Sequence, residues 1–172
     1  KENLEMLNQF MVGGETVTDS SYESYTPEKI PEKFEAGLQN YPGIIGFGAA
    51  TKYLENITVK NIQKQIVKLN EIATSGLSEI SGIEILGPKG ADKRSGVISF
   101  VIKDKQVHEV SLLLNNTYNI MVRSGAHCVH SWFNKDKNKE SVFKDGTVRA
   151  SFSFYNTEEE VQQFVQAVKE IS

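Results

Sequence analysis

A single cysteine lies in a setting that could do chemistry. Cys128 is the only cysteine in the chain, and it follows His127 in the segment from Arg123 to Cys128, which reads RSGAHC. A cysteine attacks as its thiolate, and a nearby cation or imidazole favours that form. Gly125 lets the backbone turn there without a steric penalty. The segment therefore predicts an exposed, activated nucleophile; the alternative is a small buried apolar cysteine, which is common among free cysteines.

Two arginines accompany this cysteine in the sequence. Arg123 lies five residues before it, and Arg149 lies in the stretch 147–155, where apolar and polar residues alternate. In a strand this alternation puts Val148 and Ala150 on the core face and Arg149 on the other face. A planar guanidinium can bind a carboxylate through two parallel hydrogen bonds. Arg149 is thus a candidate carboxylate ligand, and an ordinary solvated surface arginine is the alternative.

The same segment leaves a metal site open as a second interpretation. His127, Cys128 and His130 carry the imidazole and thiolate groups that usually bind zinc. However, spacings of one and two residues rarely let three side chains converge on one ion, and the sequence has no second cluster of Cys and His. We therefore expect no metal ion.

Composition excludes several classes of protein. Of the 172 residues, 39% are hydrophobic and 24% are charged, which is close to the globular average, and the formal net charge is -3. This charge gives no support to a nucleic-acid partner, and no apolar run is long enough to span a membrane. One cysteine cannot form an intramolecular disulfide, so we expect a reducing, cytoplasmic location. Because the chain begins at Lys1 rather than Met, we also expect that a segment precedes it.

From about residue 55 onward the patterns predict one compact domain. The expected elements are a helix of roughly twenty residues closed by Gly76 and Gly82, strands at 83–86 and 97–102, a helix ended by Asn115 and Asn116, and strands at 120–122 and 147–155. Thr157 and Glu160 then form a capping box that opens a last helix. This order describes an α+β sandwich in which helices cover one face of a mainly antiparallel sheet.

The remaining segments carry weaker patterns. The first ~40 residues lack a periodic pattern, and such a stretch rarely makes a core alone, so we expect them to pack against another part of the protein. The apolar, glycine-containing segment 43–54 predicts a buried helix. The lysine-rich segment 134–144 predicts a surface loop.

Several motifs together resemble one known family, the cysteine desulfurases and selenocysteine lyases of the class V aminotransferase superfamily, in particular its SufS-like group. The segment from Arg123 to Cys128 is similar to that group's R-[ST]-G-x-H-C. Arg149-Ala150-Ser151 followed by 155–161 (YNTEEEV) is similar to its R-A-S…Y-N-T-x-E-E-[VI] ending. The segment 34–37 (FEAG) and the pair Gly13-Gly14 match in order and spacing as well.

The resemblance implies an α/β protein of the pyridoxal-phosphate-dependent transferase fold, type I. Residues 1–55 would be the C-terminal end of the large cofactor-binding domain, and residues 56–172 would be the small C-terminal domain with the catalytic cysteine. The resemblance also implies that Cys128 accepts sulfur from L-cysteine as a persulfide while L-alanine is released, and that Arg149, Arg123 and His127 contact the substrate. The sulfur would pass to an acceptor or scaffold protein for iron–sulfur cluster assembly.

The resemblance further implies a homodimer that binds pyridoxal 5'-phosphate. The family commonly has Thr after the Phe-Glu-x-Gly motif, where its hydroxyl reaches the cofactor phosphate of the partner subunit, but this sequence has Leu38. That phosphate contact would pass to the backbone at Gly37 and Leu38. The family's Schiff-base lysine lies upstream of Gly13-Gly14, so we expect this chain alone to be inactive. The alternatives are a selenocysteine lyase, another class V aminotransferase, or a non-catalytic sulfur-carrier or dimerisation module.

Overall fold

The structure, a computed structural model, describes residues 2–135 and 140–172. Residues 136–139 of the expected surface loop lie outside the described residues. The chain divides into two compact units, one that ends at Asn56 and one that comprises Ile57–Ser172. This division falls close to the boundary expected from the sequence. The assignment of the first unit to a larger cofactor domain stays a prediction.

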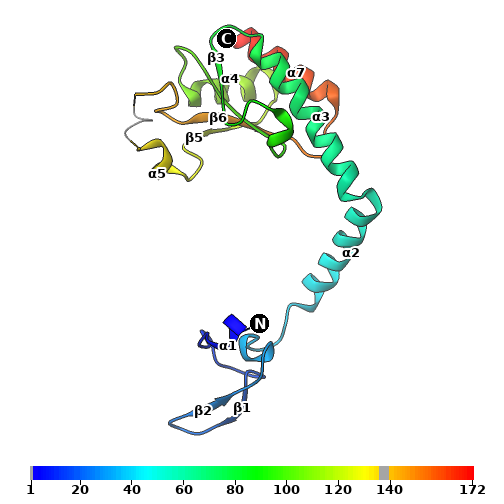
Figure 1. Ribbon diagram of the computed structural model, residues 1–172, viewed down its shortest axis with the longest axis vertical. Helices are drawn as coiled ribbons and strands as arrows, with labels where there is room; N and C mark the ends of the chain where they lie inside the picture. The colour runs from blue at the N-terminus through cyan, green and yellow to red at the C-terminus, as the bar shows by residue number, and fades with distance from the viewer. Residues whose placement is uncertain (1, 136–139) are drawn as a thin grey trace. The chain divides into compact units, whose positions relative to one another are not determined.

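The first unit contains little core of its own. Its elements are α1 (Glu2–Glu5), the hairpin strands β1 (Val17–Ser20) and β2 (Tyr25–Pro27), the short 3-10 helix η1 (Glu32–Phe34) and α2 (Tyr41–Ile57) (Figure 1). Thr16 is buried, and its hydroxyl donates a hydrogen bond to the carbonyl of Gly13 at 2.8 Å. The loop that contains Gly13 and Gly14 is thereby tied to the start of β1.

Helix α2 forms where the sequence predicts a helix, but the expected burial is wrong. None of its residues is buried, and Ile45 and Phe47 are 73% and 76% exposed. The apolar side chains are those of a packed helix, yet nothing else in the described part of the first unit covers them. An apolar helix surface of this kind indicates a surface that packs against further protein.

The second unit is an α+β domain built on a four-stranded antiparallel sheet, as the sequence predicts. The strand order is β3-β4-β6-β5. The elements are α3 (Val59–Ser78), β3 (Ile83–Leu86), η2 (Ala91–Lys93), β4 (Val97–Ile102), α4 (Val107–Tyr118), β5 (Arg123–Gly125), α5 (His130–Phe133), β6 (Thr147–Ser151) and α7 (Glu158–Ile171).

One face of this sheet carries the core. Ile98 and Phe100 of β4 lie opposite Ala150 and Val148 of β6, and all four side chains are buried. Helices α3, α4 and α7 pack on this core, with α3 and α7 side by side (Figure 1). Phe164 of α7 contacts the ring of Phe100 edge-on at 6.0 Å between ring centroids. The opposite face carries Ser99 of β4 and Arg149 of β6, which lie opposite each other in the register.

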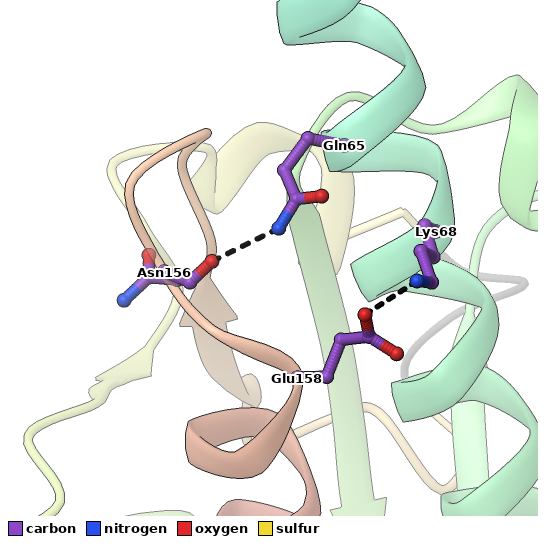
Figure 2. Close-up of polar contacts among 4 residues, drawn as sticks. All are labelled: Gln65, Lys68, Asn156 and Glu158. Carbon is purple, nitrogen blue, oxygen red and sulfur yellow. Dashed lines mark hydrogen bonds and ion pairs between the residues drawn. The ribbon is translucent and has the colours of Figure 1, made fainter.

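Polar contacts hold α3 to the start of α7. Gln65 donates from Nε2 to the carbonyl of Asn156 at 3.1 Å, and Lys68 forms an ion pair with Glu158 (Figure 2). Glu158 lies in the first turn of α7, where a negative charge complements the helix dipole. The capping box expected at Thr157 and Glu160 is also present. These contacts fix the end of the β6–α7 connection.

Four element boundaries differ from the sequence-based expectation. Gly76 lies inside α3 rather than at its end. Helix α4 continues past Asn115 and Asn116 to Tyr118 and ends at Asn119, which adopts the left-handed conformation with φ 55°. The strand expected at 120–122 begins only at Arg123, because residues 123–125 are the ones that pair with β6, and β6 ends at Ser151 rather than at Tyr155. Among the described residues, no helix is both long and apolar enough to cross a bilayer.

Gly76 marks the close approach of α3 and α7, and this contact gives a stability prediction. A Cβ atom at position 76 would lie 2.5 Å from Cγ1 of Val165. We expect Gly76→Ala to lower the free energy of unfolding by about 1–3 kcal/mol through overpacking, measured by urea denaturation. Adding Val165→Ala should remove most of the penalty that Gly76→Ala introduces. If Gly76→Ala lowers the free energy of unfolding equally in the parent protein and in the Val165→Ala variant, the close packing of α3 and α7 at Gly76 is contradicted.

Candidate functional site

The lone cysteine lies on the segment that leaves β5. Cys128 is exposed, as the sequence predicts. Within residues 125–128, three have a positive φ: Gly125 with φ 103°, His127 with φ 52° and Cys128 with φ 64°. For a residue other than glycine this conformation costs about 1–2 kcal/mol. Such strain persists only where surrounding contacts hold the backbone in place, and it concentrates at functional sites.

A guanidinium lies directly beside the sulfur. Nη2 of Arg123 donates to Sγ of Cys128 at 3.1 Å. A positive charge at this distance stabilises negative charge on sulfur, whether the sulfur is attacking or leaving. The structure therefore brings together the cysteine and the first of the two arginines that the sequence singled out.

The second arginine lies next to the first on the sheet. Arg123 of β5 and Arg149 of β6 are directly opposite each other in the antiparallel register, so both belong to the same face. Val148 and Ala150 fill the core face, so the two arginines lie on the face opposite the core. Two like charges directly opposite each other are destabilising. An anion that bound both guanidinium groups would relieve this repulsion.

His127 is held against β6, and its surroundings favour the neutral imidazole. Its Nε2 lies 2.8 Å from Oγ1 of Thr147, which is fully buried. Burial lowers the pKa of His127, and the positive charges of Arg149 and Arg123 lower it further, while a hydrogen bond with Thr147 acts in the opposite direction. A neutral imidazole beside the thiol adds no third positive charge to the site.

His108 lies next to this site, although no sequence pattern singled it out. The sequence indicated an exposed histidine on a helix, and its side chain is indeed exposed. However, its Nδ1 lies 2.9 Å from Oγ of Ser124, the central residue of β5. Only the packing of α4 against β5 reveals this contact. A buried threonine at position 147, the partner of His127, is likewise visible only in the structure.

The geometry does not favour the zinc alternative. Among residues 2–135 and 140–172, no group of three His, Cys, Asp or Glu side chains is arranged to hold a metal ion. The Nε2 atom of His127 is already bonded to Thr147. His130 starts the short helix α5.

Gly37 and Leu38, the expected phosphate contacts, lie in the first unit. Gly37 adopts φ 76°, and its N–H donates to the carbonyl of Gly14 at 2.9 Å. Leu38 has no side-chain donor and is 87% exposed. The Gly37 amide could contact a phosphate only if it gave up its hydrogen bond to the carbonyl of Gly14. These residues do not form a pyridoxal phosphate site by themselves.

Comparisons with known proteins place this chain in one family. The aminotransferase class-V family model matches residues 1–164. A probable cysteine desulfurase of Methanothermobacter thermautotrophicus is 39% identical over 166 residues, which are 96% of this chain and 40% of the relative. A probable cysteine desulfurase of Pyrococcus abyssi is 39% identical over 171 residues, 99% of this chain and 41% of the relative.

A solved structure supports the same assignment. The apo structure of a cysteine desulfurase from Thermococcus onnurineus NA1 is 37% identical, with a TM-score of 0.82, over 94% of this chain and 38% of that chain. The chain belongs to the aminotransferase class-V family, whose members use pyridoxal phosphate. The expected α/β fold of the pyridoxal-phosphate-dependent transferases is confirmed. The chain spans about 40% of the length of the curated relatives that it matches.

The lowered pKa of His127 predicts a loss of stability in acid. Because the folded state holds His127 below the ordinary value of 6.5, the unfolded state binds more protons at mildly acidic pH. The contribution of His127 to stability is therefore complete above pH 6.5 and is lost as the pH falls through the lowered folded value. We expect His127→Gln, which keeps a polar group near Thr147 and does not titrate, to weaken this dependence. Urea denaturation between pH 8 and pH 5 measures it.

A control separates this effect from general acid sensitivity. His130→Gln removes an exposed histidine close by in the sequence. It should leave the acid-side loss as it is in the parent protein. If both variants lose stability in acid as steeply as the parent, His127 is not the group responsible.

Proposed function

We propose that this chain is part of a pyridoxal-phosphate-dependent cysteine desulfurase, in which Cys128 takes sulfur from L-cysteine as a persulfide. The relatives named above are cysteine desulfurases or probable ones, and they match nearly the whole chain. The observation that carries the proposal is the contact between Arg123 and Sγ of Cys128 at 3.1 Å, on an exposed segment.

The sulfur-transfer step can be written for Cys128 with its atoms balanced. The thiolate of Cys128 attacks the sulfur of the substrate. The new bond joins the two sulfur atoms, and the bond that breaks joins the substrate sulfur to its β-carbon. The electron pair of the broken bond remains with the carbon skeleton, which becomes alanine after protonation. Arg123 stabilises the negative charge of the attacking sulfur and then that of the terminal sulfur of the persulfide.

Arg149 is proposed to hold the α-carboxylate of the substrate. A carboxylate bound to the guanidinium of Arg149 would offset the repulsion between Arg149 and Arg123, which lie opposite each other. His127, whose pKa is lowered by burial and by the two arginines, would contact the substrate as a neutral imidazole. It would orient the substrate without competing with the arginines for the carboxylate.

The cofactor would be held by protein beyond the described residues. Pyridoxal phosphate, when bound, supplies the electron sink for the chemistry at the substrate's carbon atoms. The Gly37 amide is already bonded and Leu38 offers no side-chain donor, so the phosphate contacts would come from elsewhere. The resemblance implies that the Schiff-base lysine lies upstream of Gly13 and Gly14. We infer that this chain alone is inactive for that reason.

The wider assignments rest on the same proposal. The sulfur would pass to an acceptor protein for iron–sulfur cluster assembly, since an exposed persulfide is open to a second thiol. The uncovered apolar surface of α2 supports packing on the rest of the enzyme and in a homodimer. A thiol that must stay reduced between turnovers supports a cytoplasmic location.

The first test is the role of Cys128 in the full-length protein that carries this chain. We expect the protein to convert L-cysteine to L-alanine with sulfur bound at position 128, detected by mass spectrometry. Cys128→Ala should abolish the bound sulfur and the release of alanine, and the absorbance of the bound cofactor should not change. If this variant releases alanine from L-cysteine undiminished, Cys128 is not the nucleophile.

The same assay tests the inactivity of the chain alone and the choice of substrate. The 172-residue chain, incubated with pyridoxal phosphate and L-cysteine, should release no alanine. Turnover by the chain alone would refute the inference about its missing contacts. Faster alanine release from L-selenocysteine than from L-cysteine would favour a selenocysteine lyase instead.

A second test addresses Arg149. We expect Arg149→Ala to lower kcat/KM for L-cysteine by the equivalent of about 2–5 kcal/mol, mainly through a higher KM, because the carboxylate loses its partner. Arg149→Lys should recover only part of this loss, since lysine lacks the planar fork. Lys103→Ala, which removes an exposed cation just after β4, is the matched control and should leave KM unchanged. An unchanged KM in Arg149→Ala would exclude the carboxylate contact.

A further inference from the structure

The strand that delivers Cys128 has little support within its own sheet. β5 comprises only three residues and lies at the edge of the sheet, where it pairs with β6. It leads directly into the left-handed residues Gly125, His127 and Cys128. A strained segment that continues from a short edge strand needs contacts from outside the strand to keep one conformation.

His108 provides such a contact from α4. Its Nδ1 atom lies 2.9 Å from Oγ of Ser124. Its ring also lies against the next residue, since a Cβ atom at Gly125 would be 3.3 Å from Cε1 of His108. One imidazole therefore contacts both the last part of the strand and the first residue of the left-handed turn.

The helix beneath His108 is a rigid base for this contact. His108 lies in the first turn of α4, and its neighbours Val107 and Val110 are 4% and 1% exposed. Leu114, two turns further along, is fully buried in the same core. The position of the imidazole is thus set by the core of the domain rather than by the exposed loop.

The β6 side completes the support of the turn. A Cβ atom at Gly146 would lie 2.4 Å from the carbonyl carbon of Gly125, so the two backbones are in close contact. The hydrogen bond between His127 and Thr147 holds the following residues to β6. If the contact of His108 were lost, α4 would keep its hydrogen bond from Oγ of Ser111 to the carbonyl of Val122, which lies before the strand, but it would no longer bond Ser124.

We propose that His108 is a positioning residue for Cys128: it bonds Ser124 and contacts Gly125 so that the sulfur stays beside Arg123. His108 acts through the backbone of β5 and the turn. This role deepens the proposed function, because it concerns the placement of the same nucleophile. It can nevertheless be measured without any turnover of cysteine.

The test compares how fast two alkylating reagents react with Cys128 in the 172-residue chain. Iodoacetate is an anion and iodoacetamide is neutral, and the only cysteine makes the labelling specific. Both reagents react with the thiolate, so the fraction of thiolate cancels when the rate constant for iodoacetate is divided by that for iodoacetamide. This ratio therefore reports the positive charge beside the sulfur. Arg123→Gln calibrates the method, and it should lower the ratio by about threefold or more at low ionic strength.

Five further variants test the contact between His108 and Ser124. His108→Ala and Ser124→Ala should each lower the ratio at least about twofold toward the Arg123→Gln value. The double variant should be no lower than the single ones, since both changes remove one interaction. His108→Asn places a polar atom near the site of Nδ1 and should restore the ratio, whereas His108→Gln places it near the site of Nε2 and should not.

Leu112→Ala is the matched control, because it shortens an exposed side chain on the same helix. It should leave the ratio at the parent value. A parent-like ratio in His108→Ala, with a lowered ratio in Arg123→Gln, would overturn the positioning role. So would equal ratios for His108→Asn and His108→Gln. Neither result depends on desulfurase activity, so failure of the proposed function would appear only in the alanine assay.

Discussion

The register between β5 and β6 is the constraint on which the arrangement around Cys128 depends. It sets Arg123 opposite Arg149 and Gly125 opposite Thr147. The first pairing puts two guanidinium groups on one face, and the second brings the turn next to the threonine that binds His127. A shift of one residue would send the side chains of β5 to the other face. The arginine pair would then be separated by the sheet.

The core of the domain protects that register. β6 is held between β4 and β5, and its residues Val148 and Ala150 are buried against the face that the helices cover. Phe164 packs edge-on against Phe100, and α3 is bonded to the beginning of α7. Hydrophobic packing on one face of the sheet thus fixes the charged groups on the other. Arg149 lies on β6, which cannot leave the sheet without exposing this core.

Sequence patterns predicted the elements whose signals are local. The helical periodicity of α3, the apolar runs of β3 and β4 and the capping box of α7 depend on neighbouring residues, and these elements formed as expected. The start of β5 and the role of His108 depend on pairing between distant segments, which no local pattern contains. The predicted burial of α2 was wrong for a related reason: its apolar residues indicate a covering surface, and the described part of the first unit does not supply one. The exposure of Cys128 was predicted correctly because its polar neighbours are a local signal.

The left-handed backbone at Cys128 restricts what evolution or engineering can put there. With φ at 64°, β-branched side chains such as threonine or valine would be severely strained at this position. Serine has the same unbranched geometry as cysteine and can replace it with little change in shape. A chain diverging from this one could therefore exchange sulfur for oxygen at position 128 and keep the loop intact, so loss of the thiol need not imply loss of the architecture around it.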